Sequence, residues 1–482
     1  MSSTATPGAS DGTHAAAPPG GALLVTLAMA QFMVVLDFTI VNVALPSIER
    51  GLHVPTTTLQ WLVSGYAVSF GGFLLLGGRL ADVFGKARLY RIGLCVFVLA
   101  SIAGGLAVEP VLLIASRVVQ GIGASLLAPA GLSLLVTSWP DEKGRSRALG
   151  IYGAVASTGF ASGALLGGLL VEASWRLVFF VNAPIGIALL VASFRLLPAA
   201  PPGRSKQLDI PGAVTVTAGV ALLVLAVSRA GDTLSPTQPA VAAGVALVLI
   251  GAFIARERRA PAPLLDMALL KDRGILGANL CLIGVGAFSA AEVLLVTLYL
   301  QEGRHLRPVL TGLCFVPQAA GAFALSGPAS KLVPTLGPRR SLAISMAITV
   351  LALSGAAASA ATGWLVGLLA ALFVLGVANR LSQVASALAG TRGPVAARSE
   401  GTASALLTAT RQCGSALGVA IVSATLVALH GTSGHRTALS LLVAACFAFL
   451  ALLASRVVPP GPPRPESPRR EHLFHRHAGG LP

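Results

Sequence analysis

Asp37 is the residue of this chain whose type and position most strongly suggest chemistry. It stands in the stretch LDFTIVNVALP, residues 36–46, inside an apolar run long enough to cross a bilayer. A carboxylate at bilayer depth costs at least about 2.5 kcal/mol, so acids in such runs usually mark a path for ions or substrates. We therefore expect Asp37 to take part in moving protons or solutes.

Arg117 and Glu292 are ionisable residues at a similar expected depth. From the outer ends of their runs, Arg117 is about seven residues in, or roughly 10 Å, Asp37 about eight and Glu292 about nine. Arginine keeps a neighbouring carboxylate ionised, whereas an unpaired carboxyl group out of water takes up a proton more readily. Asp37, Arg117 and Glu292 thus predict a proton-coupling site. A static Asp37–Arg117 ion pair and a purely structural Glu292 are the alternatives.

Two more cations, Arg380 and Arg411, lie about 9 to 10 residues from the inner ends of their runs, too deep to reach water easily. Arg380 could face an aqueous cavity and favour polar or anionic groups of a substrate. The residues assigned to possible substrate binding are Asn42, Glu292, Arg380, Arg411 and Gln412.

The composition requires that most of the chain lie in lipid. Of the 482 residues, 55% are hydrophobic and 11% charged, against about a quarter charged in soluble domains. Fourteen apolar runs are long enough to span a bilayer. They are residues 22–45, 57–78, 92–108, 111–137, 148–171, 177–196, 210–228, 239–255, 274–301, 309–333, 341–360, 364–388, 401–428 and 437–457.

The basic residues predict the orientation of these runs. When the runs are laid alternately through the bilayer, 25 of the 34 Lys and Arg fall on the side of both termini, six on the other side and three within runs. Both termini are therefore expected in the cytoplasm. The net charge of +16 then reflects membrane orientation, and nucleic acid is not an expected partner.

The expected organisation is an all-α membrane protein with two six-helix bundles and two extra central helices. We predict a disordered cytoplasmic tail at 1–21, a first bundle at 22–196, a linker with two extra spans at 197–273, a second bundle at 274–457 and a disordered basic tail at 458–482.

Cysteine and histidine give no metal site. The five cysteines, all in apolar runs without CxxC spacing, predict buried core residues. They are Cys95, Cys281, Cys314, Cys413 and Cys446. The histidines His472, His475 and His477 fall in the basic tail, where a solvated tail is favoured over metal binding. No cofactor is predicted.

A glycine-rich loop motif occurs twice. The stretch GGFLLLGGRLADVFGKARLYR, residues 71–91, recurs in degraded form as GPASKLVPTLGPRRS, residues 327–341, with Val333 or Pro334 near the place of the aspartate. This closely resembles the major facilitator superfamily, and a motif at matching places in two halves indicates a duplicated transporter. The resemblance implies that Asp82 gates the cytoplasmic side against the helix that starts near Gly401. A solvated interfacial carboxylate is the alternative. The loop residues assigned to gating are Gly78, Arg79, Asp82, Gly85, Lys86 and Arg88.

Five further motifs narrow the resemblance. They are LDFTIVNVALP, RVVQGIGAS from Arg117, WRLVFFVNAPIG from Trp175, LDIPG from Leu208 and TATRQCGSALGVAI from Thr408. Together they resemble the fourteen-helix drug:proton antiporters. The glycine stripe of the fifth span belongs to the same pattern and also permits close helix packing by itself. It consists of Gly159, Gly163, Gly167 and Gly168. The chain departs from the family at Ala164, where proline is expected, and at Tyr152, where glycine is expected.

The expected function is proton-coupled export of a small, mainly hydrophobic drug or antibiotic across the cell membrane by a monomer, in contact with the lipid bilayer. Ala164 leaves a proton-coupled importer or a uniporter as an alternative. A membrane sensor or a lipid-modifying enzyme is an alternative function of a different class. Against an enzyme, the sequence shows no nucleophile-base set and no soluble catalytic domain.

Overall fold

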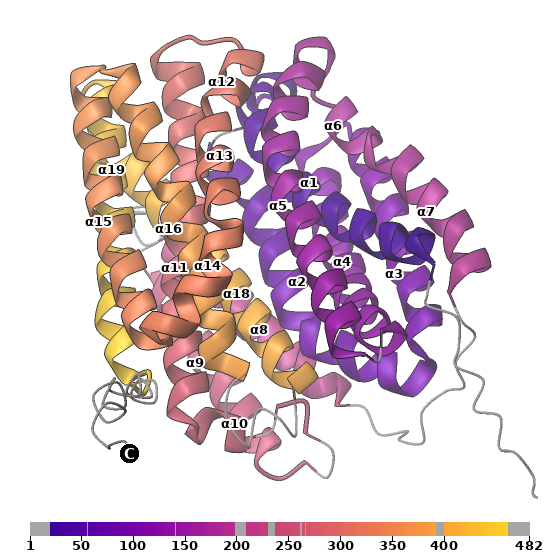
Figure 1. The fold of residues 1–482 in the computed structure, drawn as a ribbon. Helices are drawn as coiled ribbons and strands as arrows, with labels where there is room; N and C mark the ends of the chain where they lie inside the picture. Colours follow the sequence, from indigo (N-terminus) through magenta and orange to yellow (C-terminus); the bar gives the residue numbers. More distant parts are fainter. Residues whose placement is uncertain are drawn as a thin grey trace, which may run out of the picture.

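The computed structural model in Figure 1 describes residues 20–54, 56–139, 141–197, 209–229, 237–260, 263–265, 267–391 and 400–460. The regular elements in these ranges are all helical. Thirteen helices are long and apolar enough to cross a membrane, or fourteen when one bent pair counts as a span, which confirms the predicted fold class. The tails predicted to be disordered lie almost wholly outside the described residues.

The first bundle contains six spans. They are α1 (Gly21–Leu52), α2 (Thr56–Phe84), α3 (Lys86–Gly105), α4 (Pro110–Ser138), α5 (Glu142–Ala173) and the pair α6 (Leu177–Phe180) and α7 (Asn182–Leu196). Helix α4 packs against α2 and α3, and α1 packs against α5 and α7. Helix α1 continues seven residues beyond the predicted end at 45, because Pro46 is accommodated within it.

The second bundle is built on α11 (Arg273–Leu298), which continues in a π-helical turn, η1 (Tyr299–Gly303). The other spans are α12 (Pro308–Cys314), α13 (Val316–Ala324) and α14 (Ser326–Leu336), then α15 (Pro338–Thr362), α16 (Leu365–Thr391), α18 (Glu400–Ala428) and α19 (Ser433–Ala454), which ends in η2 (Ser455–Val457). Helices α16, α18 and α19 all pack against α11.

The predicted run 309–333 is broken rather than straight. The chain bends by 50° between α12–α13 and α14. Pro328 has no N–H to donate to the carbonyl of Ala324 four residues earlier, so the helical ladder cannot continue through this point. The run is long enough to be the predicted apolar span, but it is not one continuous helix.

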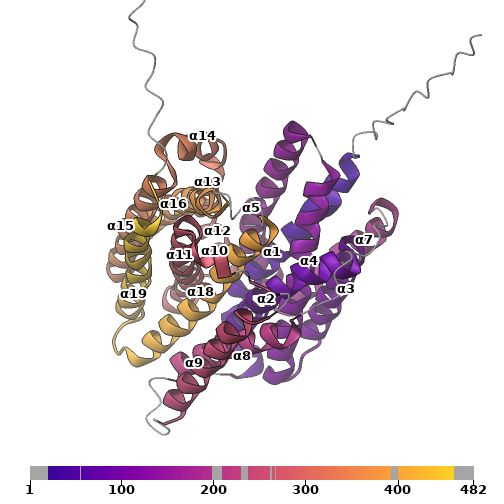
Figure 2. The same cartoon turned by 90° about the horizontal axis from the view of Figure 1, so that it is seen from below.

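The two extra spans form a hairpin of α8 (Ile210–Ser228) and α9 (Thr237–Glu257), followed by the short α10 (Met267–Lys271). Asp209 caps α8 by accepting a hydrogen bond of 2.9 Å from the backbone N–H of Gly212, and Pro211 lies in the first turn. Helix α8 packs against both α2 and α18, so it bridges the two bundles, whereas α9 packs on α8 (Figure 2).

The repeated loop has the same backbone in both halves. Gly85 and Gly337 have φ angles of 92° and 82°, a region that favours glycine, and each is followed at once by a helix. With these glycines aligned, Pro334 occupies the place of Asp82. The second copy has therefore kept the turn and lost the carboxylate.

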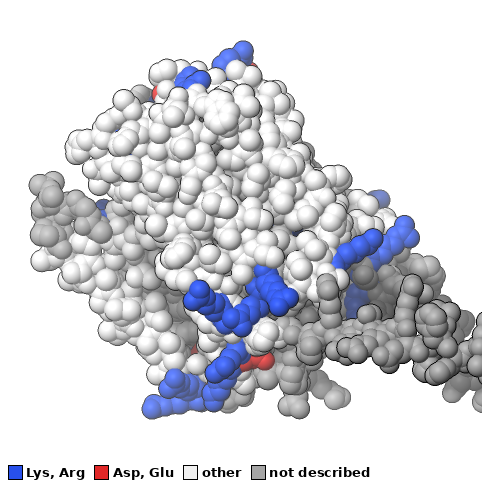
Figure 3. Space-filling view, turned by 60° about the vertical axis from the view of Figure 1, so that its left-hand side comes forward, with Lys and Arg blue, Asp and Glu red and all other residues white. Residues whose placement is uncertain are grey.

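Charged side chains gather at the two ends of the molecule. We call the lower end in Figure 1, which carries α10 and the described end of the chain, the terminal face, and the end where α12 begins the opposite face. Figure 3 shows most basic side chains near the terminal face, few near the opposite face, and a broad uncharged band between them. Such a band matches the hydrocarbon layer of a bilayer.

The bundles meet closely near the opposite face. Gln301 donates a hydrogen bond of 2.9 Å to the carbonyl of Val43, and Arg307 forms an ion pair of 2.7 Å with Glu172, each linking the second bundle to the first. Helices α12 and α13 pack on α5, whereas α14 has its main contacts within its own bundle. The ribbons of α5 and α14 accordingly stand apart at the terminal face (Figure 2).

Candidate functional site

Asp37 and Arg117 form an ion pair in the interior of the first bundle. Nη1 of Arg117 lies 2.6 Å from Oδ2 of Asp37, and the two side chains are 1% and 0% exposed. Asp37 belongs to α1 and Arg117 to α4. The structure thus brings together the two residues that the sequence predicted to meet.

Three neutral polar residues complete this network. Nε2 of Gln120 and Nδ2 of Asn182 each donate a hydrogen bond of 2.8 Å to Oδ1 of Asp37. Asn182 also donates to Oγ of Ser101, at 3.0 Å. Gln120 belongs to α4, Asn182 to α7 and Ser101 to α3, so the carboxylate of Asp37 ties α1 to two other helices directly and to a third through Ser101.

Arg117 connects the network to α2 as well. Its Nε donates a hydrogen bond of 3.0 Å to the carbonyl of Leu62, and its guanidinium lies 4.3 Å from the ring centre of Tyr66. A second bond of 2.6 Å runs from Nη1 to Oε1 of Gln120. Burial of an ion pair is tolerated when further hydrogen bonds satisfy both groups, and that condition is met here. Removing one partner of such a pair costs about 3–5 kcal/mol.

The glycine stripe of α5 places this helix directly against α1 beside Asp37. A Cβ atom on Gly159 or Gly163 would lie 2.9 or 2.8 Å from the carbonyl oxygen of Phe32 or Leu36, so only glycine allows this approach. Gly167 meets Ile40 in the same way. Gly168 lies on another side of α5, where it contacts Pro308 and Val309 of α12 in the second bundle.

Glu292 is buried in the second bundle and has few hydrogen-bond partners. Oε2 accepts a hydrogen bond of 3.0 Å from Gln318, and Oε1 has no partner. No described cation forms an ion pair with it. Glu292 therefore does not join Asp37 and Arg117 in one network, and its predicted place in the proton-coupling site stays a prediction.

The other residues predicted to bind substrate are scattered over three helices. Asn42 is buried on α1, where its amide donates to the carbonyl of Phe38 and its Oδ1 is unpartnered. Gln412 lies against Gly71 of α2 at the bundle seam. Arg380 on α16 and Arg411 on α18 are partly buried, and the structure assigns neither a described acceptor.

The predicted gating loop lies at the terminal face. Asp82 is exposed and makes no hydrogen bond or ion pair with any described residue. Arg79 donates a hydrogen bond of 2.7 Å to the carbonyl of Pro263, in the segment after α9. The predicted partner helix, α18, begins at Glu400 and packs along α2, but no hydrogen bond or ion pair joins it to Asp82 in the described part of the chain. The gating roles of Gly78, Gly85, Lys86 and Arg88 also stay predictions.

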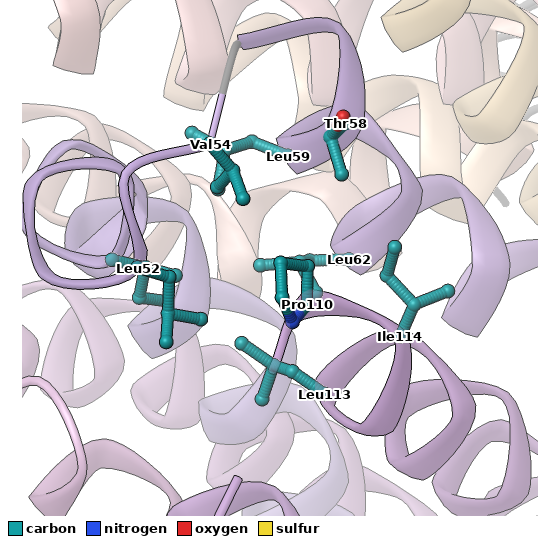
Figure 4. Close-up of a pocket in the computed structure, with 9 residues that line it drawn as sticks. Leu52, Val54, Thr58, Leu59, Leu62, Pro110, Leu113 and Ile114 are labelled. Atoms are coloured by element: carbon teal, nitrogen blue, oxygen red, sulfur yellow. The ribbon is translucent and has the colours of Figure 1, made fainter. Parts of the chain in front are cut away.

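A small pocket near the opposite face lies apart from these residues (Figure 4). It is lined by the end of α1 and the starts of α2 and α4, and the side chains that Figure 4 labels are apolar apart from Thr58.

Among the described residues no group of His, Cys, Asp and Glu is suited to a metal ion. Cys281 and Cys314 are buried as predicted. Cys95 and Cys413 are only partly buried, and Cys446 is exposed on α19, so the prediction is wrong for Cys446.

Sequence reasoning missed the neutral members of the network. Gln120 follows Arg117 by three residues in RVVQG, and Asn182 lies in FVNAP, so both belong to motifs of the family resemblance, which does not predict a role for either. Residues three apart on a helix share a face, which was the available signal for Gln120. Tyr66, Ser101 and Gln318 had no comparable signal.

Comparison with known proteins identifies the family. The family model described as Major Facilitator Superfamily matches residues 27–418 and, overlapping, 281–479. Puromycin resistance protein pur8 of Streptomyces alboniger is 36% identical, over 86% of this chain and 84% of that protein. Cephamycin export protein CmcT of Amycolatopsis lactamdurans is 37% identical, over 85% of each chain.

Solved structures share the fold. A bacterial homologue of the human lysosomal transporter Spinster has a TM-score of 0.65 at 15% identity, covering 91% of this chain and 97% of that one. A peptide transporter of the POT family has a TM-score of 0.63 at 16% identity, covering 91% and 96%. The family match, the relatives and the helical architecture together show that this chain belongs to the major facilitator superfamily, a family of membrane transporters and not of enzymes.

Proposed function

We propose that the protein is a proton-coupled antiporter that exports small, mainly hydrophobic drugs or antibiotics by alternating access. The observation that carries the proposal is the buried network around Asp37, in a chain whose relatives are named for antibiotic resistance and export. A buried, fully hydrogen-bonded carboxylate within a transporter is a natural place to load and release a proton.

The contacts of Asp37 suggest how the proton acts. Protonation removes the charge that holds Arg117, and Arg117 then keeps only its bonds to Leu62 and Gln120. The direct tie between α1 and α4 is weakened, whereas that between α2 and α4 persists. In the antiport cycle a proton on Asp37 and a bound substrate exclude each other through this change.

The glycine contacts of α5 offer a route from the proton site to the bundle interface. Gly163 touches the backbone of Leu36, next to Asp37, and five residues later Gly168 touches Pro308 and Val309 of the other bundle. A shift of α1 therefore reaches α12 through a single rigid helix. Packed elements with two discrete arrangements are the physical basis of such coupling.

The arrangement of the bundles supports an inward-facing state of the cell-membrane protein. Glu172 pairs with Arg307 at the opposite face, whereas α5 and α14 stand apart at the terminal face even though α2 packs along α18. The basic residues favour a cytoplasmic terminal face with both termini inside. The unengaged Asp82 fits this state, since its predicted contact belongs to the form that is shut on the cytoplasmic side.

Proton release from everted vesicles tests the proposal. With an inward-acid gradient in place, puromycin, lincomycin or a cephamycin should each be tried, and at least one should release protons and accumulate. A uniporter would equilibrate the compound without moving protons, and a proton-coupled importer would move both in the same direction. A sensor or enzyme would do neither, so each of these outcomes contradicts antiport.

A further inference from the structure

The second bundle carries positive charge that its described residues do not neutralise. Arg380 and Arg411 form no ion pair with a described residue, and Nε of Arg380 is buried without an acceptor. In the first bundle, by contrast, the buried Arg117 has an acid, an amide oxygen and a carbonyl as acceptors. Guanidinium groups keep their charge in proteins, so the two positive charges cannot be removed by losing protons.

Arg380 and Arg411 lie at one level of the molecule. Arg380 is eleven residues before Thr391, the last of α16, and Arg411 is eleven residues after Glu400, the first of α18, and both helix ends lie at the terminal face. At 1.5 Å per residue each is about 16 Å along its helix from that face. Helices α16 and α18 pack against each other and both against α11, so the two cations lie on neighbouring helices.

The contacts of α18 show which way Arg411 is turned. Gln412 lies against α2, Gly414 against α11, and Leu417 in the apolar cluster around Val224 of α8. The backbone carbonyl of Arg411 packs against Gly286 of α11, so Arg411 borders the contact with α11. At 100° per residue it is turned away from α8 and lies near the exposed Thr408. The exposure of Thr408 shows that this side of α18 is open on the terminal half of the molecule.

On α16, Arg380 follows the glycine that packs against α13. A Cβ on Gly376 would collide with the carbonyl of Gln318, and Arg380 is one turn nearer the terminal face on the same side of α16. Below this contact α13 gives way to the bent α14, which also packs against α16. Arg380 is only partly buried, as a group reaching into an aqueous space would be.

We propose that Arg380 and Arg411 form a subsite for an anionic group of the transported compound, a carboxylate, phosphate or sulfonate on an otherwise apolar body. This inference rests on the proposed export function and names a substrate class for it. Guanidinium groups bind such oxyanions through paired hydrogen bonds, and a bound anion offsets the cost of holding two cations away from bulk water. Glu292 is eight residues farther along α11 from the terminal face than Arg411 is along α18, so the subsite is separate from that acid.

The test compares two fluorescent probes in everted vesicles, anionic carboxyfluorescein and cationic ethidium. We expect the wild-type protein to accumulate carboxyfluorescein, and Arg380→Gln and Arg411→Gln each to lower the ratio of carboxyfluorescein to ethidium uptake at least about tenfold. Arg380→Lys and Arg411→Lys should keep part of the ratio, since ammonium retains the charge but not the planar donor fork. Arg147→Gln, which removes an exposed cation near the start of α5, is the matched control and should leave the ratio unchanged.

The outcomes separate this inference from the proposed function. Accumulation of ethidium or proton release by puromycin, without carboxyfluorescein uptake, would overturn the anion subsite and leave export standing. A ratio unchanged in both Gln variants, in protein that remains monodisperse on size exclusion, would overturn the assignment to these arginines. If none of the compounds is transported, the proposed export function itself is contradicted.

Discussion

At the scale of residues, the Asp37 carboxylate is shared among donors from two helices, so a change of one charge alters several contacts at once. Arg117 is bound to Oδ2, while Gln120 and Asn182 are bound to Oδ1. An amide in place of the carboxylate keeps the size and one acceptor oxygen, but it cannot titrate and presents two N–H donors toward residues that are themselves donors.

Asp37→Asn should therefore abolish uphill export while leaving some flux down a substrate gradient. The proton has no site, yet the bundles can still exchange substrate. Uptake into everted vesicles, measured with and without a proton gradient, separates the two activities. Because Arg117 loses its counter-charge, a loss of stability of about 3 kcal/mol is expected as well, and the amount of folded protein must be measured in parallel.

Glu292→Gln should mainly change which substrates are accepted, with cationic compounds losing most. Its one described partner, Gln318, can still hydrogen-bond an amide, so packing is little disturbed. The roles of the two acids could be reversed, and the same pair of measurements would show it. Uphill transport that survives in the double variant Asp37→Asn with Glu292→Gln rules out proton coupling at either carboxylate.

The sequence predicts charged partners better than neutral ones. Asp37 and Arg117 could be paired from depth alone, because each is costly in lipid and needs the other. Gln120 and Asn182 are far less costly there and have many possible partners, so their contact with Asp37 depends on helix rotation, which the sequence does not fix. The depth of Glu292 stays a prediction, and its contact with Gln318 of α13 likewise depends on the rotation of two helices.

At the scale of elements, α5 packs beside Asp37 on α1 and also touches α12 of the other bundle. Gly163 should not tolerate a methyl group, since a Cβ there would lie 2.8 Å from the carbonyl oxygen of Leu36 and 2.9 Å from Cβ of Thr39. Gly163→Ala is expected to destabilise the protein by about 1–3 kcal/mol through overpacking. Gly150→Ala on the same helix is the control, because nothing lies within 4 Å and alanine favours helix. Thermal unfolding in detergent should show a lower midpoint for the first variant only, and equal midpoints would contradict the close packing of α5 on α1.

The loop after α2 gives a second prediction at this scale. Asp82→Asn should lower the transport rate about tenfold without loss of folded protein, since it removes a charge that faces a helix start in the closed form but fills no buried space. Glu109→Gln, which changes an exposed acid at the opposite face, serves as control and should transport normally. Wild-type rates for Asp82→Asn, at equal expression, would reduce Asp82 to an ordinary interfacial residue.

The limits of sequence reasoning about elements are visible at two helices. Apolar length predicted all the spans, because bilayer thickness sets it. It could not predict that α1 continues to Leu52 through Pro46 or that the tenth run bends by 50°, since both depend on how neighbouring helices accept the free carbonyls near a proline.

At the scale of the whole molecule, orientation is the simplest property to test. A reporter that is active only outside the cytoplasm, fused after Pro482, should give no signal, because the basic residues favour a cytoplasmic terminal face. The same reporter inserted after Gly431, between α18 and α19 at the opposite face, should be active. The reverse pattern would invert the membrane orientation and with it the proposed direction of transport.

The contact between bundles at the opposite face decides whether the molecule works by rocking. Glu172 and Arg307 are 26% and 71% exposed, so their ion pair contributes no more than about 1 kcal/mol and can open in each cycle. Replacing both by cysteine and joining them with a reducible bifunctional thiol reagent, whose spacer replaces the length of the Arg and Glu side chains that meet at 2.7 Å, should hold this face shut. Transport should stop on cross-linking and return on reduction, while either single cysteine variant treated in the same way should keep its activity. Full transport by the cross-linked protein would show that the opposite face does not need to open, and alternating access between these two bundles would then be wrong.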